Sequence, residues 1–153
     1  MVTAASAGFE GGNYAKITVD GEVIDCGKNE NGHDRGVHIV VINPLTGKVR
    51  NAKVFDTYKS SEEWNNFILT VPQGYVVAVA CKDECSKSWN WGGKKFLVHM
   101  GAIEIWYLQY RQGYVFIGEF GRAAPWGCAN EKRAEKVEEA VSTTQVFTLR
   151  TES

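Results

Sequence analysis

The pattern of hydrophobic and polar positions predicts short strands separated by turns, with few helical stretches. An unbroken apolar run occupies residues 75–81, between a Pro-Gln-Gly turn and the charged triplet Lys82-Asp83-Glu84. A short valine-rich run bounded by turn residues is typical of a strand that is buried on both faces. Because the run ends in charged residues, we expect this strand to deliver polar side chains to one rim of a sheet.

Other parts of the chain carry similar strand signals. Residues 14–24 alternate around Asp20-Gly21, which predicts a hairpin with a two-residue turn. Further apolar or alternating runs bounded by turn residues predict strands at 37–42, 48–58, 114–118 and 145–149.

Two stretches carry helical signals instead. The sequence Ser-Ser-Glu-Glu at 60–63 is typical of a helix start, and Trp64, Phe67 and Ile68 then fall on one helical face. Residues 94–100 fit a second short helix. Strands that outnumber the helices and do not alternate strictly with them predict an α+β fold with a largely antiparallel sheet.

Three segments are less regular. Residues 1–13 are small and Gly-rich, and we predict a flexible N-terminal segment ahead of a single domain at 14–153. The pattern at 101–110 leaves strand or irregular structure open. The heavily charged stretch 131–141 fits either a solvated helix or a segment that becomes ordered on assembly.

The composition is that of an ordinary globular protein. At 153 residues, with 44% hydrophobic and 23% charged residues, the chain suits one domain with a single core. The net charge is −1 and the basic residues are scattered, so the sequence argues against the basic face that nucleic-acid binding requires. No apolar run reaches the ~20 residues needed to cross a bilayer. We therefore expect neither a nucleic-acid partner nor membrane insertion.

The four cysteines, Cys26, Cys81, Cys85 and Cys128, lack the paired spacing of a zinc ribbon. We predict two disulfides in an oxidising compartment, with a small loop closed by Cys81 and Cys85 and a long-range link from Cys26 to Cys128. Four reduced thiols are the alternative. The first residues contain no hydrophobic signal segment, which leaves a mature secreted chain, unconventional export and the cytosol open. With the cysteines, an extracellular location is the expectation.

The sequence does not suggest catalysis. It contains none of the nucleophile-elbow, zinc-peptidase or phosphate-loop motifs, and no spacing argument selects a glycosidase pair from Asp56, Glu104 and Glu119. We predict a protein that is not an enzyme and holds no cofactor or metal. Aromatic residues make up 12% of the chain, with five Trp, and serve either a β-rich core or a binding surface.

Four blocks of sequence carry a family resemblance. In order and spacing the chain resembles the interleukin-like EMT inducer / pancreatic-derived factor (PANDER-like) domain family over roughly Tyr14 to Arg122. That family includes the carbohydrate-binding stem domain of protein O-mannose N-acetylglucosaminyltransferase. The blocks are Arg35-Gly-Val-His-Ile-Val-Val-Ile-Asn43, Val54-Phe-Asp-Thr-Tyr58, Val79-Ala-Cys-Lys-Asp-Glu84 and Arg111-Gln-Gly-Tyr-Val-Phe-Ile-Gly118.

The resemblance implies two mostly antiparallel sheets packed together, with two or three short flanking helices and no catalytic machinery. It also implies a soluble lectin for a sugar of the N-acetylglucosamine or galactose type, with Arg35, Asp83 and Arg111 at the binding positions. A carboxylate accepts hydrogen bonds from sugar hydroxyls, and a guanidinium donates them through a planar fork. The aromatic residues expected beside them are Tyr114, where the family prefers Trp, and Trp89 and Trp91.

Each of these residues also has a structural interpretation. Asp83 suits a helix N-cap or an ion pair with Lys82 or Lys87, the two arginines suit ion pairs at the sheet rim, and both tryptophans suit packing. The competing function is a secreted cytokine-like ligand for a protein receptor, as the animal members of the family suggest. A homo-oligomer would convert weak single-site sugar binding into avidity.

Overall fold

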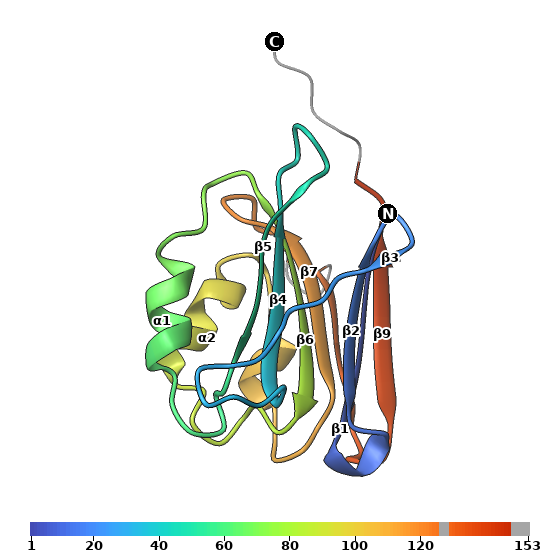
Figure 1. Cartoon of the computed structure of the whole chain (residues 1–153), viewed down its shortest axis with the longest axis vertical. Helices are drawn as coiled ribbons and strands as arrows, with labels where there is room; N and C mark the ends of the chain where they lie inside the picture. The colour runs from blue at the N-terminus through green and yellow to red at the C-terminus, as the bar shows by residue number, and fades with distance from the viewer. Residues whose placement is uncertain (126–128, 148–153) are drawn as a thin grey trace.

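The structure, a computed structural model, describes residues 1–125 and 129–147. In this part of the chain, nine strands are joined by hydrogen bonds into one mixed sheet that folds into two packed layers (Figure 1). The central layer is antiparallel and has the order β5 (Val49–Phe55), β4 (Gly36–Ile42), β6 (Val76–Asp83), β7 (Tyr114–Glu119) and β8 (Asn130–Arg133).

The second layer lies against one face of the central layer. It has the order β3 (Glu22–Val23), β2 (Tyr14–Val19), β1 (Val2–Gly8) and β9 (Ala140–Gln145), again antiparallel. The two layers are connected where the end of β1 pairs in parallel with the end of β6, through Ala7–Lys82 and Gly8–Asp83.

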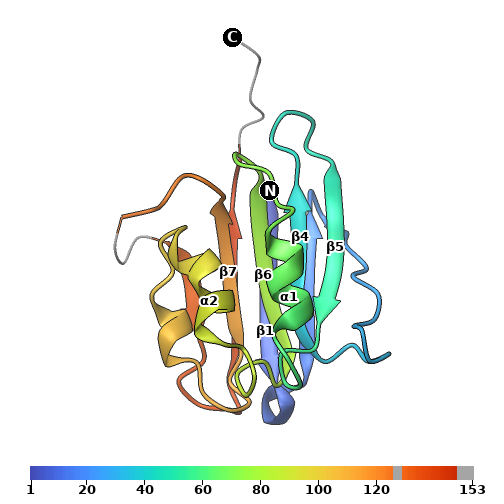
Figure 2. The same ribbon diagram turned by 90° about the vertical axis from the view of Figure 1, so that its left-hand side faces the viewer.

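The helices cover the other face of the central layer (Figure 2). They are α1 (Glu62–Ile68) and α2 (Trp91–Val98), accompanied by the 3₁₀ turn η2 (Glu104–Tyr107), while the 3₁₀ turn η1 (Phe9–Gly11) follows β1. The α+β fold with two packed layers and two short flanking helices is therefore confirmed, with the difference that hydrogen bonds join both layers into one sheet.

Strand β6 lies between two hydrophobic cores. Its residues Val77, Val79 and Cys81 pack on the helix side, whereas Val76, Ala78 and Ala80 pack on the β1–β2 side. Alternate side chains of a strand point to opposite faces, so an unbroken apolar run is what burial on both faces requires. The prediction of a fully buried strand is confirmed.

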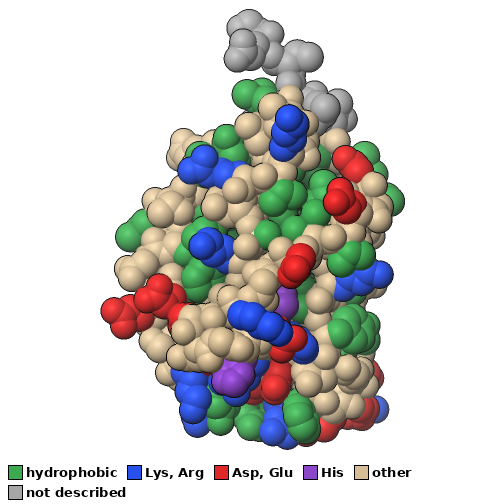
Figure 3. Space-filling model, in the orientation of Figure 1, with side chains coloured by type: hydrophobic (Ala, Val, Ile, Leu, Met, Phe, Trp, Pro, Cys, Tyr) green, Lys and Arg blue, Asp and Glu red, His purple; other side chains and the backbone are tan. Residues whose placement is uncertain are grey.

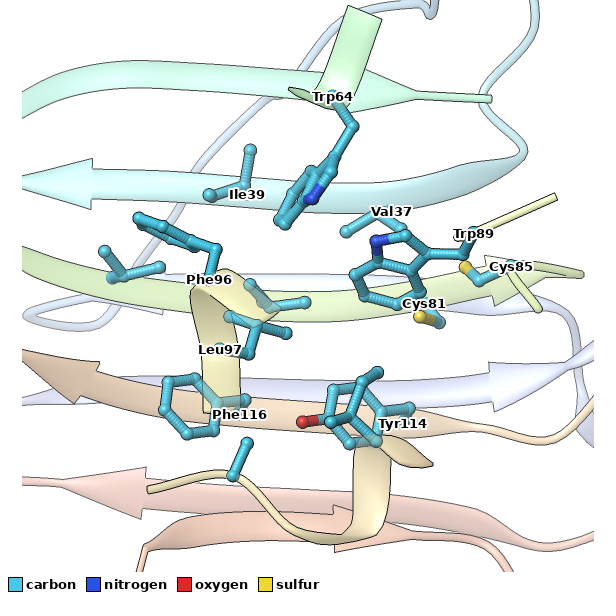
Figure 4. Packing of buried hydrophobic residues seen from close by; sticks show 14 of the residues in the cluster. Val37, Ile39, Trp64, Cys81, Cys85, Trp89, Phe96, Leu97, Tyr114 and Phe116 are labelled. Carbon is cyan, nitrogen blue, oxygen red and sulfur yellow. The ribbon is translucent and has the colours of Figure 1, made fainter. Parts of the chain in front are cut away.

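Trp64 of α1 is the centre of the helix-side core (Figure 4). Its ring is fully buried and stands edge-on to Phe55, Trp89 and Phe96, with centroids 5.9, 5.2 and 6.2 Å away. Its Nε1–H donates to the carbonyl of Gly93 in α2 at 2.8 Å. A Cβ on Gly93 would lie 2.8 Å from the Trp64 ring, so glycine is required for the two helices to meet there.

The hairpin at 14–24 and the helix at 60–68 are also confirmed. Asp20 and Gly21 both adopt positive φ, 51° and 82°, as a two-residue turn of the I′ type requires. The helix begins at Glu62, and Trp64 faces the core as expected.

The structure corrects the prediction for residues 1–13. Instead of a flexible segment, β1 runs between β2 and β9, and Val2, Ala4 and Ala7 are buried. The residues of β1 are mostly alanine, serine and glycine, which contribute little hydrophobicity. The alternation of buried and half-exposed positions along β1 is therefore not visible in the sequence as a strand signal.

The charged stretch 131–141 is corrected as well. It contributes β8 and the start of β9, not a helix. Of the strand expected at 145–149, Gln145 is the last residue of β9, and residues 148 and 149 lie outside the described residues. The Glu131 carboxylate accepts backbone N–H groups of residues 103, 104 and 105 at 2.8, 2.9 and 3.0 Å. A charged residue is therefore accommodated in a strand because its acceptors are satisfied.

Neither predicted disulfide is confirmed. Cys26, Cys81 and Cys85 are free thiols, while Cys128 lies outside the described residues. Burial raises the pKa of the Cys26 thiol to about 11. Burial also raises the pKa of the Cys85 thiol, with a further contribution from its hydrogen bond with Cys81.

The position of β1 inside the fold is tested by an aspartate scan. We expect Ala4→Asp to lower the free energy of unfolding by about 3 kcal/mol or more, because it places an unpaired charge in the core between the layers. Ala5→Asp, on the opposite and half-exposed face of the same strand, is the matched control and is expected to cost much less. Equal and small effects in urea denaturation would contradict the assignment.

Candidate functional site

The candidate site lies on the rim where β6 ends, at the lower end of the molecule in Figure 1. Gly36 faces Lys82 across β4 and β6, and Gly8 faces Asp83 across β1 and β6. Arg35 and Gly8 therefore flank Asp83 on its two sides.

Arg111 completes the row on the far side of Gly8. A Cβ on Gly8 would lie 1.8 Å from the Arg111 carbonyl oxygen, so the two backbones are in direct contact. We call the three side chains Arg35, Asp83 and Arg111 the rim row. The structure thus places the three residues that the family resemblance selected along one rim, with Gly8 of β1 between Asp83 and Arg111.

Two members of the rim row have left-handed backbone conformations. The φ angles are +64° for Asp83 and +60° for Arg111. The only other non-glycine residues with positive φ in the described ranges 1–125 and 129–147 are Asn13, two residues after η1, and Asp20, in the Asp20-Gly21 turn. Such conformations are uncommon for residues with a Cβ and occur where the surrounding structure enforces them, often at functional sites.

Arg35 is fixed by a fully buried carboxylate. Its Nε and Nη2 donate to the two oxygens of Asp56 at 2.9 and 2.7 Å, and its guanidinium lies 4.7 Å from the centre of the Tyr58 ring. Burial by itself raises the pKa of Asp56, but hydrogen bonds from Arg35 and Asn31 outweigh burial and hold the pKa below its usual value. The pKa of Arg35 is raised, chiefly by the hydrogen bond to Asp56 and to a smaller extent by the charge of Asp83.

Asp83 keeps its carboxylate available. Within the part of the chain that the structure describes, this carboxylate has no hydrogen bond and no ion pair. Lys82 instead pairs with Asp34 at 2.5 Å, and the Lys87 ammonium lies 4.7 Å from the centre of the Tyr58 ring. The ion pairs with Lys82 or Lys87 that were the structural alternative are therefore not formed.

Arg111 is held from two directions. Its Nη1 donates to Glu10 at 3.0 Å, and its guanidinium lies over the rings of Phe9 and Tyr110, 4.2 and 5.0 Å from their centres. Its backbone N–H donates to the buried carboxylate of Glu84 at 3.1 Å. The side-chain Nε is buried without a partner in the described structure.

Glu84 fixes both the end of β6 and the turn that carries Arg111. Besides the Arg111 N–H, its carboxylate accepts the N–H of Ser86 at 3.0 Å, the Ser86 hydroxyl at 2.6 Å and the N–H of Lys87 at 2.8 Å. A buried carboxylate is stable when hydrogen bonds satisfy it in this way. Glu84 is thus a positioning residue beside Asp83, one that the sequence did not single out.

Tyr114 and Trp89 do not line the site. Tyr114 is fully buried and its hydroxyl donates to Glu131, while Trp89 is 2% exposed and stands edge-on to Tyr114 and Trp64 (Figure 4). Neither ring presents a face to a ligand, which corrects the predicted sugar-stacking role of both. Trp91 is 62% exposed, but it lies on α2 and not at the strand ends.

Charged and apolar side chains are mixed on this part of the surface (Figure 3). Phe9 and Tyr110, on either side of Arg111, are 48% and 50% exposed. A hollow of about 270 Å³ lies elsewhere and is lined by, among others, Ile117, Asn130 and Gln145. The three residues of the rim row are half-buried, and none of them lines that hollow.

The carboxylates considered for catalysis are each engaged by an arginine. Asp56 binds Arg35, Glu104 accepts from Arg133 at 3.0 Å, and Glu119 lies 3.9 Å from Arg122. Among residues 1–125 and 129–147, no group of three His, Cys, Asp or Glu side chains is placed to hold a metal ion. Neither helix in those ranges has the length and apolar character of a membrane span.

The structure defines a class of protein: a layered α+β domain with charged residues at the end of its central buried strand. Comparison with known families identifies the family within this class. The chain belongs to the Interleukin-like EMT inducer family, whose model matches residues 35–122 and therefore includes the whole rim row. The family predicted from the four sequence blocks is confirmed.

Several curated proteins are similar to the chain. The human Cell migration-inducing and hyaluronan-binding protein is 34% identical over 89 residues, which are 56% of this chain and 6% of that protein. Human Protein FAM3B is 27% identical over 121 residues, 78% of this chain and 51% of the relative. Rat Protein FAM3C is 29% identical over 108 residues, 69% and 47% respectively. The chain thus spans about half the length of these FAM3 relatives.

The Arg35–Asp56 ion pair predicts a specific pH dependence. Since the pKa of Asp56 is lower in the folded than in the unfolded state, the pair stabilises the fold above the ordinary pKa of 3.8 and is lost as the pH falls through the lowered value. We expect Asp56→Asn to cost about 3 kcal/mol at pH 7, and the difference from wild type to shrink below pH 3.8. Urea denaturation across this range measures it.

Asp20→Asn is the matched control, since the Asp20 side chain pairs at the surface with the exposed N-terminal ammonium. A difference between Asp56→Asn and wild type that does not change between pH 7 and strong acid would contradict the assignment.

Proposed function

We propose that the chain binds carbohydrate through the rim row, as a lectin-type protein and not as an enzyme. The observation that carries the proposal is the Asp83 carboxylate, which has no hydrogen bond and no ion pair in the described structure and whose charge acts on the Arg35 guanidinium. Each arginine is already neutralised, Arg35 by Asp56 and Arg111 by Glu10. The site therefore offers an acceptor and directed donors without a strong excess of either charge.

This combination suits a sugar. Neighbouring hydroxyls both donate and accept, so they match a site that offers both a carboxylate and guanidinium N–H groups. Arg35 uses Nε and Nη2 for Asp56, and Arg111 uses Nη1 for Glu10, which leaves one Nη of each arginine for a ligand. Phe9 and Tyr110 supply exposed aromatic faces beside Arg111 for the apolar side of a sugar ring.

The similarity to a protein named hyaluronan-binding also supports a glycan partner. The matched 89 residues are a small part of that protein, so its name lends support to the class of ligand and not to a particular sugar. The N-acetylglucosamine or galactose type remains our proposal for the preferred sugar. An extracellular location and a homo-oligomer that gains avidity belong to the same proposal.

A cytokine-like ligand for a protein receptor is the second candidate function. It is favoured by the name of the family and by the FAM3 relatives, whose similarity extends over 78% and 69% of this chain. The two functions differ in a simple respect, because free sugar competes for a lectin site and not for a receptor contact that is purely protein.

Asp83→Asn tests the sugar site directly. The variant keeps the size of the side chain, and asparagine tolerates the left-handed backbone as well as aspartate does. Because hydrogen bonds to a charged group contribute about 1.5–3 kcal/mol, we expect the affinity for glycans that wild type binds on an array to fall about 10- to 100-fold. Titration calorimetry with the same glycans measures the loss.

Asp20→Asn is the control, since Asp20 also has a positive φ and a side chain at the surface. It is expected to bind as wild type does. Wild-type protein that binds no glycan above background, or Asp83→Asn that binds unchanged, would contradict the proposal. Cell binding that no sugar inhibits would favour the cytokine-like function instead.

A further inference from the structure

Two tryptophans form a stacked pair on the helix side of the molecule. Trp91, the first residue of α2, lies nearly parallel to Trp106 of η2, with ring centroids 3.7 Å apart and planes inclined by 18°. Trp106 packs against the helix-side core and is half-buried, whereas Trp91 is 62% exposed. One face of the Trp91 indole is therefore covered by Trp106, and the opposite face is open to solvent.

The pair is held on well-anchored segments. The side chain of Asn90 accepts the Gly93 N–H at 2.8 Å and caps α2 immediately before Trp91. The carboxylate of Glu131 accepts the N–H groups of the residues that begin η2. The exposed indole face is thus presented in a fixed orientation, which lowers the entropic cost of binding a flat ligand.

Two further exposed aromatic residues lie between Trp106 and Arg111 in the sequence. Tyr107 and Tyr110 are 60% and 50% exposed, and the Tyr110 ring lies 5.0 Å from the Arg111 guanidinium. Only four residues separate Trp106 from Arg111, so their Cα atoms, five steps apart along the chain, are at most about 18 Å from each other. We call Trp91, Trp106, Tyr107 and Tyr110 the aromatic strip.

We propose that the aromatic strip is an extended subsite for an oligosaccharide whose terminal ring occupies the rim row. This inference rests on the proposed function. The pyranose rings of such a chain present flat apolar C–H faces, which stack on the open face of Trp91, while polar recognition remains at Asp83. Exposed aromatic rings next to the charged rim row provide apolar contacts and add no charge. This combination suits a neutral sugar chain.

The length of the ligand supplies the test. The probes are N-acetylglucosamine with its β-1,4-linked dimer and tetramer, and galactose with lactose and a tetrasaccharide of two lactosamine units. For the series that binds, we expect wild-type affinity to rise with chain length. Trp91→Ala is expected to lose about three- to tenfold in affinity for the tetramer, corresponding to one aromatic contact, and less than twofold for the monosaccharide. Trp91→Phe should recover part of the loss.

Controls separate this inference from the proposed function. Leu69→Ala removes another exposed apolar side chain, 84% exposed at the end of α1, and should bind every probe as wild type does. Asp83→Asn should weaken all lengths alike. Wild-type binding that does not depend on length, or that Trp91→Ala leaves unchanged, overturns the subsite alone, whereas absence of any glycan binding overturns the proposed function.

A protein surface is the competing use of the aromatic strip. Sedimentation of wild type and Trp91→Ala distinguishes it, since a dimer that dissociates in the variant would show that a second copy covers Trp91 and would overturn the proposal. Equal sedimentation together with a length-dependent blue shift of tryptophan fluorescence, absent in Trp91→Ala, supports it.

Discussion

The two residue pairs that join β1 to β6 are the constraint on which the rim of this protein depends. Among the described residues, Ala7–Lys82 and Gly8–Asp83 are the strand pairs that join the second layer to the central layer, and they lie at the end of β6. Gly8 has no side chain, so the Arg111 backbone packs directly against it. Any other residue at Gly8 would push Arg111 away from Asp83. The β1–β6 pairing that connects the two layers therefore also sets the spacing of the rim row.

Three carboxylates, buried at Asp56 and Glu84 and half-buried at Glu131, then fix the segments around this connection. Asp56 binds Arg35, Glu84 binds the turn that carries Arg111, and Glu131 binds the start of η2. Each is satisfied by several donors, mostly charged or backbone N–H groups, so burial is tolerated. Because these three acids are used within the fold, Asp83 is distinguished from them by its lack of a partner in the described residues. Asp83 therefore differs in role from the three other acids because of its position at the end of β6, and not because of its residue type.

The sequence predicted the features that depend on local pattern. The valine run, the Asp-Gly hairpin and the Ser-Ser-Glu-Glu start each report a backbone preference that tertiary contacts did not override. Asp83 was identified because it ends the run, and its neighbours in the rim row came from the family resemblance. Strand β1 was missed because its buried and half-exposed positions are occupied mainly by alanine and serine, which differ little in hydrophobicity. Strand β8 was missed because the partners of Glu131 are distant in the sequence.

The tryptophans show most clearly where sequence reasoning ends. Trp89 and Trp91 are two residues apart in one loop-and-helix junction, yet one is buried in the core and the other is exposed. The reason is geometric. Chain direction changes between them, where α2 begins, so that Trp89 points towards Trp64 and Tyr114 while Trp91 lies on Trp106. Pattern alone assigns both to one role, although only the tertiary structure shows which ring has a free face.

A rigid rim favours binding of a ligand to a preformed site over induced fit. Asp83 and Arg111 keep left-handed backbones because Glu84 and Gly8 hold the surrounding segments. A ligand then pays little to order the site, and affinity depends on how well its own donors and acceptors match. An open surface of this kind gives modest affinity for a single ring. Further contact along neighbouring rigid elements, or several copies acting together, is the physical route by which such a site becomes selective.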